Sequence, residues 1–216
     1  MPGPVAVFRA NSQGGTLSDL KRICQSVATL DAIIMQEWEL RYYSYNSRWS
    51  LKREMASMRN GSGDHYFILF VPEGCAIKGF YRGAATAKMG YSEEKFYSGL
   101  PSVFEESFLH EPAFTASEVS FVLWRLRNDA EWTMKPREVS ATETGADLLL
   151  HNMTGGPEAY QDWATNYYER DVPLSSVRAI YQHHPVNQNI ISELNPKVDQ
   201  AQLAADLDEI GYPKLF

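Results

Sequence analysis

The apolar run Tyr66–Val71 constrains the fold more than any other segment of the sequence. It is the longest unbroken apolar stretch, and turn-like sequences flank it at Asn60–Asp64 and Pro72–Gly74. A short apolar run between turn residues is typical of a strand, and it falls far below the ~20 residues that a membrane-spanning helix needs. Tight turns on both sides join strands in the antiparallel sense. We therefore expect an antiparallel sheet built around a strand at His65–Val71.

Other segments show the alternation or the turn boundaries of strands. Trp38, Leu40 and Tyr42 alternate with charged residues, which is the period of a half-buried strand. The further strands are predicted at Glu37–Tyr43, Met55–Arg59, Cys75–Phe80, Glu118–Leu126 and Glu131–Met134. The sequence thus predicts an antiparallel sheet of five or six strands over about residues 37–134.

Helical patterns lie on both sides of the predicted sheet. Leu17, Leu20, Cys24 and Val27 begin an apolar stripe that predicts a helix from 17 to 34, and Ser102–His110 opens in the form of a capping box. From about residue 144, prolines punctuate short helices, as proline does in a first helical turn. These helices are predicted at Ala146–Asn152, Pro157–Glu169, Leu174–Gln182, Asn187–Leu194 and Asp199–Ile210. Segregated strands and helices predict an α+β fold, with residues 1–143 and 144–216 as two portions of one domain.

Composition and cysteine content favour a cytoplasmic protein. The chain has 216 residues, 44% of them hydrophobic and 22% charged, values typical of a globular chain. Its two cysteines, Cys24 and Cys75, are too few for a disulfide framework, and the N-terminal residues lack the basic and apolar regions of a secretory signal. We expect neither a membrane span nor a targeting segment.

Charge is distributed unevenly along the chain. Residues 1–60 carry eight Lys and Arg against five Asp and Glu, whereas residues 61–216 carry 12 against 22, within a net charge of −7. A mildly basic region on an acidic body is typical of a binding face, although such asymmetry also arises without one.

Two segments of the sequence resemble catalytic motifs, but both motifs are incomplete. Gly83–Gly90 lacks the Gly-Lys-Ser/Thr end of a phosphate-binding loop, and Pro112 interrupts the helix that a zinc site at His110-Glu111 would need. Glu106 and His110 share a helix face but lack a third ligand, so a solvated face is the favoured interpretation. The sequence nominates no catalytic residue, no metal ligand and no cofactor.

The segment Arg41–Arg59 combines basic and aromatic side chains. Such a segment suits an acidic protein surface or single-stranded nucleic acid, while core packing of its aromatic residues is the structural alternative. The candidate binding surface comprises Arg41, Tyr43, Arg48, Trp49, Arg59, Asp64 and His65. We expect Arg48, Trp49 and Arg59 to be substantially exposed. A protein partner is favoured over nucleic acid, and a homodimer is a further possibility.

Histidines offer a different class of function. The loop Asn60–Asp64 and His65 could form an anion-binding or acid–base site, and His183-His184 could contribute to it in a small-molecule or metal-dependent enzyme. The structural alternatives are a plain turn between strands and a histidine pair that ends a helix. Proximity of His65, His183 and a carboxylate would favour the enzyme.

Three segments resemble an intracellular bacterial family that has no assigned activity. They are Met55–Phe70, Ile77–Phe80 and the stretch VLWRLRNDAEW that ends at Trp132. The resemblance implies a bacterial, cytoplasmic, single-domain α+β protein and carries over no catalytic residue. The failed motifs, the acidic body and the basic and aromatic segment Arg41–Arg59 beside the sheet favour a non-enzymatic binding protein that acts through a protein partner.

Overall fold

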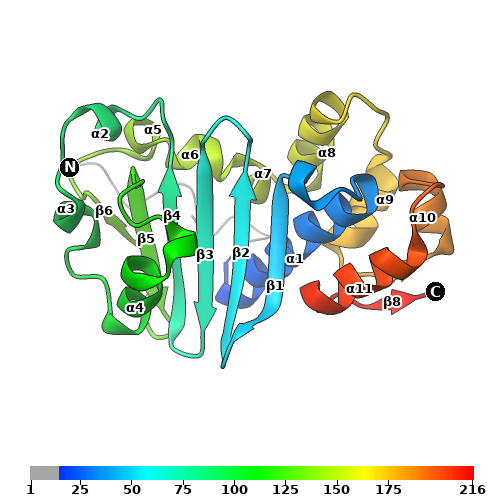
Figure 1. The fold of residues 1–216 in the computed structure, drawn as a ribbon, viewed down its shortest axis with the longest axis horizontal. Helices are drawn as coiled ribbons and strands as arrows, with labels where there is room; N and C mark the ends of the chain where they lie inside the picture. The colour runs from blue at the N-terminus through cyan, green and yellow to red at the C-terminus, as the bar shows by residue number, and fades with distance from the viewer. Residues whose placement is uncertain (1–14) are drawn as a thin grey trace.

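The chain folds around a six-stranded antiparallel sheet. The computed structural model describes residues 15–216. The strands are β1 (Tyr43–Ser50), β2 (Arg53–Arg59), β3 (His65–Val71), β4 (Gly74–Phe80), β5 (Phe121–Leu126) and β6 (Thr133–Lys135). They lie side by side in the order of the sequence, and every neighbouring pair is antiparallel (Figure 1). The predicted α+β class and antiparallel sheet are confirmed.

Helix α1 (Leu17–Ile34) has the bounds that the sequence predicts. The Thr16 side chain accepts a hydrogen bond from the Asp19 backbone N–H, and the Asp19 carboxylate accepts one from the Thr16 N–H, which completes a capping box. The apolar stripe of α1 packs on the sheet face that lies behind the strands in Figure 1. Local capping and periodicity therefore specify this helix without help from distant residues.

The remaining helices form two groups. The first lies between β4 and β5 and consists of α2 (Ala85–Lys88), α3 (Glu93–Tyr97), α4 (Ser102–His110) and the 3-10 turn η3 (Pro112–Phe114). The second follows β6 and consists of α5 (Ala141–Thr144), α6 (Ala146–Leu149), α7 (His151–Thr154), α8 (Gly156–Tyr167), α9 (Leu174–Tyr181), α10 (Gln188–Leu194) and α11 (Gln200–Ile210). Short strands β7 (Val186–Asn187) and β8 (Lys214–Leu215) pair in parallel within the second group. The predicted cluster of short C-terminal helices is confirmed.

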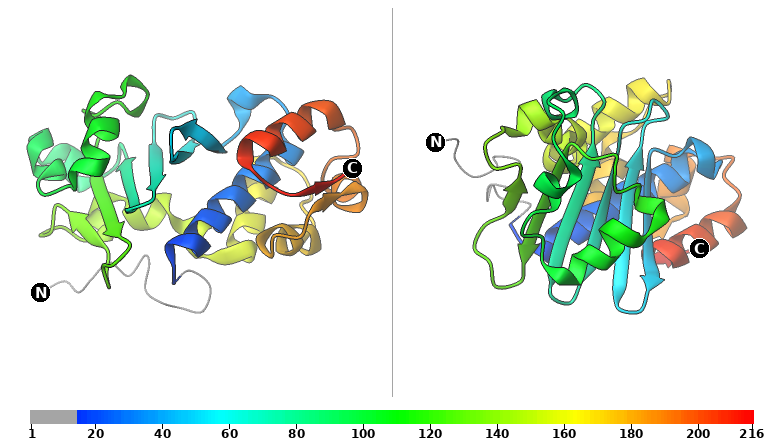
Figure 2. Two further views of the ribbon diagram at one scale, coloured as in Figure 1. Left: turned by 90° about the horizontal axis from the view of Figure 1, so that it is seen from below. Right: turned by 60° about the vertical axis from the view of Figure 1, so that its left-hand side comes forward.

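The sheet is covered on both faces. In β3, Tyr66, Ile68 and Phe70 belong to the core shared with α1 and the C-terminal helices, whereas Phe67 and Leu69 belong to a second core shared with α3, α4 and η3. The two helical layers lie on opposite sides of the strands in the view from below (Figure 2, left). Burial on both faces explains why this strand is a continuous apolar run rather than an alternating one.

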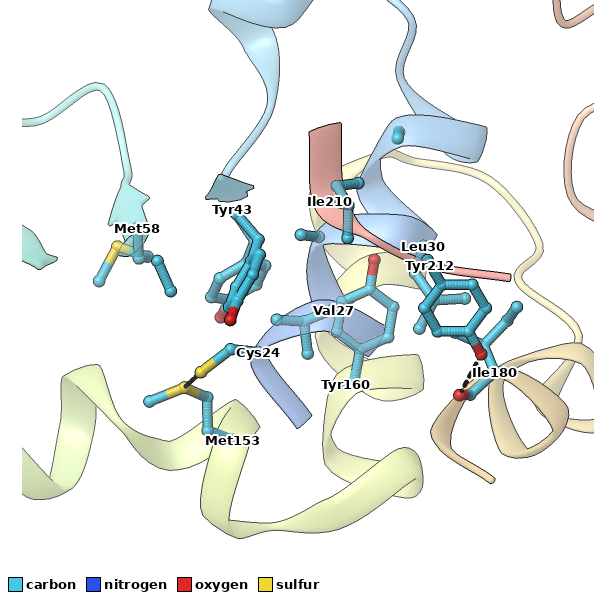
Figure 3. Close-up of a cluster of buried hydrophobic side chains, with 14 of the residues drawn as sticks. Cys24, Val27, Leu30, Tyr43, Met58, Met153, Tyr160, Ile180, Ile210 and Tyr212 are labelled. Carbon is cyan, nitrogen blue, oxygen red and sulfur yellow. Dashed lines mark hydrogen bonds between the residues drawn. The ribbon is translucent and has the colours of Figure 1, made fainter. Parts of the chain in front are cut away.

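The core behind the sheet joins α1 to the C-terminal helices (Figure 3). The Cys24 Sγ lies 3.7 Å from the Met153 Sδ, and the Tyr212 hydroxyl donates a 2.7 Å hydrogen bond to the Ile180 carbonyl. Burial raises the pKa of the Cys24 thiol. Cys24 is therefore a packing residue, as its place on the apolar stripe of α1 predicts.

The predicted strand at Glu37–Tyr43 is wrong. Its first half forms a 3-10 turn, η2 (Trp38–Leu40), in which Trp38 and Leu40 are 55% and 54% exposed. The strand begins only at Tyr43 because the buried Asp31 carboxylate accepts hydrogen bonds from the backbone N–H groups of Tyr42 and Tyr43 at 2.9 and 2.7 Å. A contact from the end of α1 thus overrides the local alternation.

Candidate functional site

Two residues of the predicted binding surface are not at the surface. The Arg41 side chain is 6% exposed, and its guanidinium donates to the Asp206 carboxylate at 2.6 Å and to the Met35 carbonyl at 2.8 Å. Tyr43 is 2% exposed and its hydroxyl accepts a hydrogen bond from Asn152. The prediction is wrong for both residues, because α11 and the residues after α1 engage the Arg41 guanidinium and Asn152 of α7 engages the Tyr43 hydroxyl.

The other members of the predicted surface have different environments. Arg48 and Arg59 are exposed as predicted, whereas Trp49 is half-buried and stacks on Phe114 with ring centroids 5.9 Å apart. The aromatic side chains of this segment therefore serve mainly to pack the two cores. Asp64 is half-buried, and its carboxylate caps the backbone N–H of Arg82 at 2.9 Å.

The structure does not bring the histidines together. The His183 ring lies 3.0 Å from the Arg22 carbonyl of α1 and packs on Tyr212, so it belongs to the layer behind the sheet. His65 packs against Phe67, on the opposite face. Over residues 15–216 no cluster of three or more His, Cys, Asp or Glu side chains is placed to hold a metal ion. A joint site of His65 with His183 or His184 is not formed.

One cleft lies where α1 begins and the strands β1, β2, β3 and β5 come to their lower ends in Figure 1. Its volume is about 800 Å³. It is lined by Thr16, Leu17, Ser18, Lys21, Ser47, Ser50, Lys52, Arg53, Glu54, Phe70, Val71, Pro72, Arg125 and Arg127. We call this site the basic cleft, because five of its lining residues are Lys or Arg and one is acidic.

Two of the five cations in the basic cleft are neutralised by carboxylates. The Lys21 ammonium lies 2.5 Å from the Glu54 carboxylate, and the Arg53 guanidinium lies 3.0 Å from Glu106 of α4. Glu54 is held in place by the Tyr45 hydroxyl at 2.7 Å. Among the described residues, these pairs leave the other three positive charges of the cleft without a carboxylate partner.

The remaining cations, Lys52, Arg125 and Arg127, form no ion pair within the described part of the chain. Arg125 donates to the carbonyls of Gly15 and Asp129, and Arg127 donates to the Pro72 carbonyl at 3.1 Å. A backbone carbonyl orients a guanidinium without cancelling its charge. The positive end of the α1 dipole lies in the same wall, so the cleft favours an anionic ligand.

Sequence reasoning missed Lys21, Arg125 and Arg127 as partners of the β1–β2 segment. They come from regions about 30 and 70 residues away, and only the sheet order brings β5 to the same end as β2. One signal was available, since Arg125 shares the parity of Phe121 and Leu123 within the strand and so faces the same side of the sheet.

A second site, of about 350 Å³, lies at the opposite end of β2 and β3. It unites three predicted residues, Arg59, Asp64 and His65, with the segment that follows η3. Its lining residues are Arg59, Gly61, Gly63, Asp64, His65, Phe67, Ala113, Thr115 and Glu118. We call it the His65 pocket.

The groups beneath the His65 pocket are buried and polar. Burial, and then the nearby Lys78 ammonium, hold the pKa of His65 below its usual value. Burial lowers the pKa of Lys78 to about 8, and its ammonium donates to the carbonyls of Phe114 and Thr115. The His65 Nδ1 lies 3.2 Å from the Gly63 carbonyl, and its Nε2 is buried without a hydrogen-bond partner in residues 15–216. The imidazole is therefore a neutral group near pH 7.

Comparisons with protein-family models, with curated proteins and with solved structures found no match. Among the helices of residues 15–216, none combines the length and the apolar character needed to cross a membrane. The chemistry of the basic cleft and of the His65 pocket must therefore carry the functional conclusion.

Proposed function

We propose that the protein is a non-enzymatic binding protein that recognises an acidic segment of a partner protein through the basic cleft. The observation that carries this proposal is the set of uncompensated cations, Lys52, Arg125 and Arg127, around one cleft in a chain of net charge −7. Complementary charge speeds association and selects among partners. Exposed Arg48, on the same β1–β2 hairpin, extends the positive surface beyond the cleft.

An acidic protein segment fits the basic cleft better than single-stranded nucleic acid does. Non-specific binding of single strands combines a positive groove with aromatic platforms on which bases stack. Among residues 15–216 no Tyr or Trp lines the cleft, and the aromatic residue that does, Phe70, is 7% exposed. The acidic body formed by residues 61–216 also opposes a long polyanion that extends beyond the cleft.

The proposal includes that the protein is bacterial and lies in the cytoplasm. It is supported by the resemblance noted for Met55–Phe70 and by two free cysteines, Cys24 and Cys75, that are both buried and unpaired as disulfides. A homodimer fits the same cleft if an acidic helix of a second copy occupies it. Because His183 and His184 do not join His65 in one site, the enzyme alternative rests on the His65 pocket alone as a site for a small ligand.

Fluorescence anisotropy tests the proposal directly. The probes are a labelled peptide of alternating Glu and Ser, an oligodeoxythymidine of equal charge and a peptide of alternating Lys and Ser. We expect the acidic peptide to bind, and its affinity to fall roughly tenfold between about 50 and 200 mM salt as the charges are screened. The basic peptide should not bind.

Two results would contradict this proposal. Tighter binding of the oligodeoxythymidine than of the acidic peptide would assign the cleft to nucleic acid. Absence of binding by either anionic probe at low salt would show that the uncompensated cations do not form a recognition site. Sedimentation of the protein alone over a range of concentrations distinguishes a second copy from a different partner.

A further inference from the structure

The His65 pocket contains one cation and one anion that do not neutralise each other. The Arg59 guanidinium forms neither a hydrogen bond nor an ion pair within residues 15–216, and its nearest aromatic contact is the Phe67 ring at 5.5 Å. The Glu118 carboxylate lies 3.9 Å from the His65 Nδ1, which exceeds hydrogen-bond distance. Both side chains line the same cavity, so opposite charges are available to one ligand.

The other charged groups at this site are already engaged. The Lys78 ammonium is bound to two carbonyls of the η3 segment. The Asp64 carboxylate accepts hydrogen bonds from the Asn60 side chain at 2.6 Å and from the Arg82 backbone N–H at 2.9 Å. A ligand therefore meets one free positive group, one free negative group and the neutral imidazole of His65.

The walls of the pocket are held in place without a ligand. The Asn60 side-chain oxygen accepts hydrogen bonds from the backbone N–H groups of Ser62 and Asp64, which fixes the loop between β2 and β3. Gly63 has a φ of +98°, and a Cβ there would lie 3.1 Å from the Arg82 side chain. Glycine is needed for this close left-handed turn. Because the wall is already ordered, ligand binding loses less conformational entropy.

We propose that the His65 pocket binds a free α-amino acid with an apolar side chain. Arg59 would bind the carboxylate, Glu118 would accept hydrogen bonds from the ammonium, and the side chain would lie on Phe67. The cavity of about 350 Å³ is at the small end of ligand sites, which fits a ligand of this size. A dicarboxylate would place a negative charge beside Glu118, and a diamine would place a positive charge beside Arg59.

This ligand site is independent of the basic cleft. Arg59 ends β2, whereas Lys52 precedes its first residue, so the two sites lie at opposite ends of that strand. Loss of binding at one site should leave the other unchanged. The tests of the two proposals can therefore fail separately.

Titration calorimetry with L-leucine and L-phenylalanine tests the amino-acid site. Matched probes are L-leucinol, which lacks the carboxylate, and 4-methylpentanoate, which lacks the ammonium. We expect at least one of the two amino acids to bind, and its analogues to bind at least tenfold more weakly. Amide chemical shifts of residues 59–67 and 113–118 should change on binding.

Charge-specific variants assign each contact. Arg59→Gln should weaken binding of the amino acid at least tenfold without changing the residual affinity for L-leucinol, and Glu118→Gln should show the same selectivity with respect to 4-methylpentanoate. Arg48→Gln is the control, because Arg48 is exposed on the neighbouring strand and does not line the pocket. Absence of binding by both amino acids would overturn the proposal. Equal binding by the deaminated analogue, or unchanged affinity in Arg59→Gln, would also overturn it.

Discussion

The two ends of strand β1 use polar residues in opposite ways. At its beginning, which we call the Asp31 end, the Asp31, Arg41 and Tyr43 side chains are buried. They form hydrogen bonds with α8, α11 and α7, respectively. At the β1–β2 turn, which we call the hairpin end, Arg48 and Lys52 are exposed and form no ion pair among the described residues. Similar residue types thus stabilise the fold at one end and remain available for binding at the other.

The two ends of β1 use polar residues differently because different elements cover them. Asp31 near the end of α1 and Asp206 of α11 contact the residues at and just before the beginning of β1, where buried polar groups must find partners because water is excluded. The hairpin end is also contacted, by α1 through Lys21, by α4 at Arg53 and by the end of α11 at Ser47, but Arg48 and Lys52 stay exposed to solvent. Substitutions at the Asp31 end should therefore change stability, and substitutions at the hairpin end should change binding.

The largest expected effect is that of Asp31→Ala. This substitution leaves the backbone N–H groups of Tyr42 and Tyr43 and the Tyr160 hydroxyl, which donates to Asp31 at 2.6 Å, without an acceptor. Three donors without partners, two of them fully buried, should lower the free energy of unfolding by about 3–5 kcal/mol. Urea denaturation followed by far-UV circular dichroism measures the loss. A loss below about 1 kcal/mol would show that the Asp31 end does not stabilise β1.

The next effect is a pH dependence that has its origin at Asp31. Burial raises the pKa of this carboxyl from 3.8 to about 6 in the folded protein. Because the folded state then binds the proton more tightly than the unfolded state, the contribution of Asp31 to stability is greatest below about pH 4 and falls as the pH rises to about 6. At 1.36 kcal/mol for each pKa unit, the expected fall is about 3 kcal/mol.

Asp31→Asn provides the matched control for that pH dependence. Its side-chain oxygen can still accept from the backbone N–H groups of Tyr42 and Tyr43, but the side chain does not titrate. Subtracting the unfolding free energy of this variant from that of the natural sequence at each pH isolates the contribution of Asp31. A difference that stays constant between about pH 4 and 6 would refute the raised pKa.

Arg41→Gln should have a smaller effect on stability. The shorter side chain cannot reach Asp206 and the Met35 and Gln36 carbonyls together, and the Arg41 side chain is only 6% exposed. Loss of these charge-assisted contacts should cost about 2–3 kcal/mol. The same denaturation experiment measures it, and Arg48→Gln, with an exposed guanidinium, should change stability by less than about 0.5 kcal/mol.

The smallest expected change in stability has the opposite sign. Lys52 has a φ of 58°, a left-handed conformation that glycine adopts more readily than a residue with a Cβ. Lys52→Gly should therefore stabilise the protein by about 0.5–1 kcal/mol while it weakens binding of the acidic peptide. A variant that loses both stability and binding would indicate that Lys52 stabilises the hairpin end and that this end does not serve binding alone.

The sequence predicts those parts of the fold that depend on local patterns. The bounds of α1 and β3 follow from capping, periodicity and turn residues that lie within or beside each element. The start of β1 could not be predicted in this way, because the Asp31 contact that determines it comes from the preceding helix. Alternation over Trp38–Tyr42 therefore gave the wrong element.

The two candidate sites also differ in how far they depend on local sequence. Arg59, Asp64 and His65 are close in the sequence and share a pocket as a consequence. The basic cleft depends on the order of the strands, since Arg125 reaches the hairpin end only through the pairing of β4 with β5. The burial of Arg41 likewise depends on α11, more than 160 residues further along the chain.

A comparison of two charge-reversal variants tests the central claim most directly. One carries Lys52→Glu and Arg127→Glu in the basic cleft, and the other carries Lys88→Glu and Lys197→Glu, which are exposed and do not line the cleft. Both change the net charge equally. We predict that only the cleft variant loses at least tenfold in affinity for the acidic peptide, while both unfold within about 1 kcal/mol of the natural sequence. An equal loss of affinity in both variants would show that binding follows net charge and not the basic cleft, and would contradict the account.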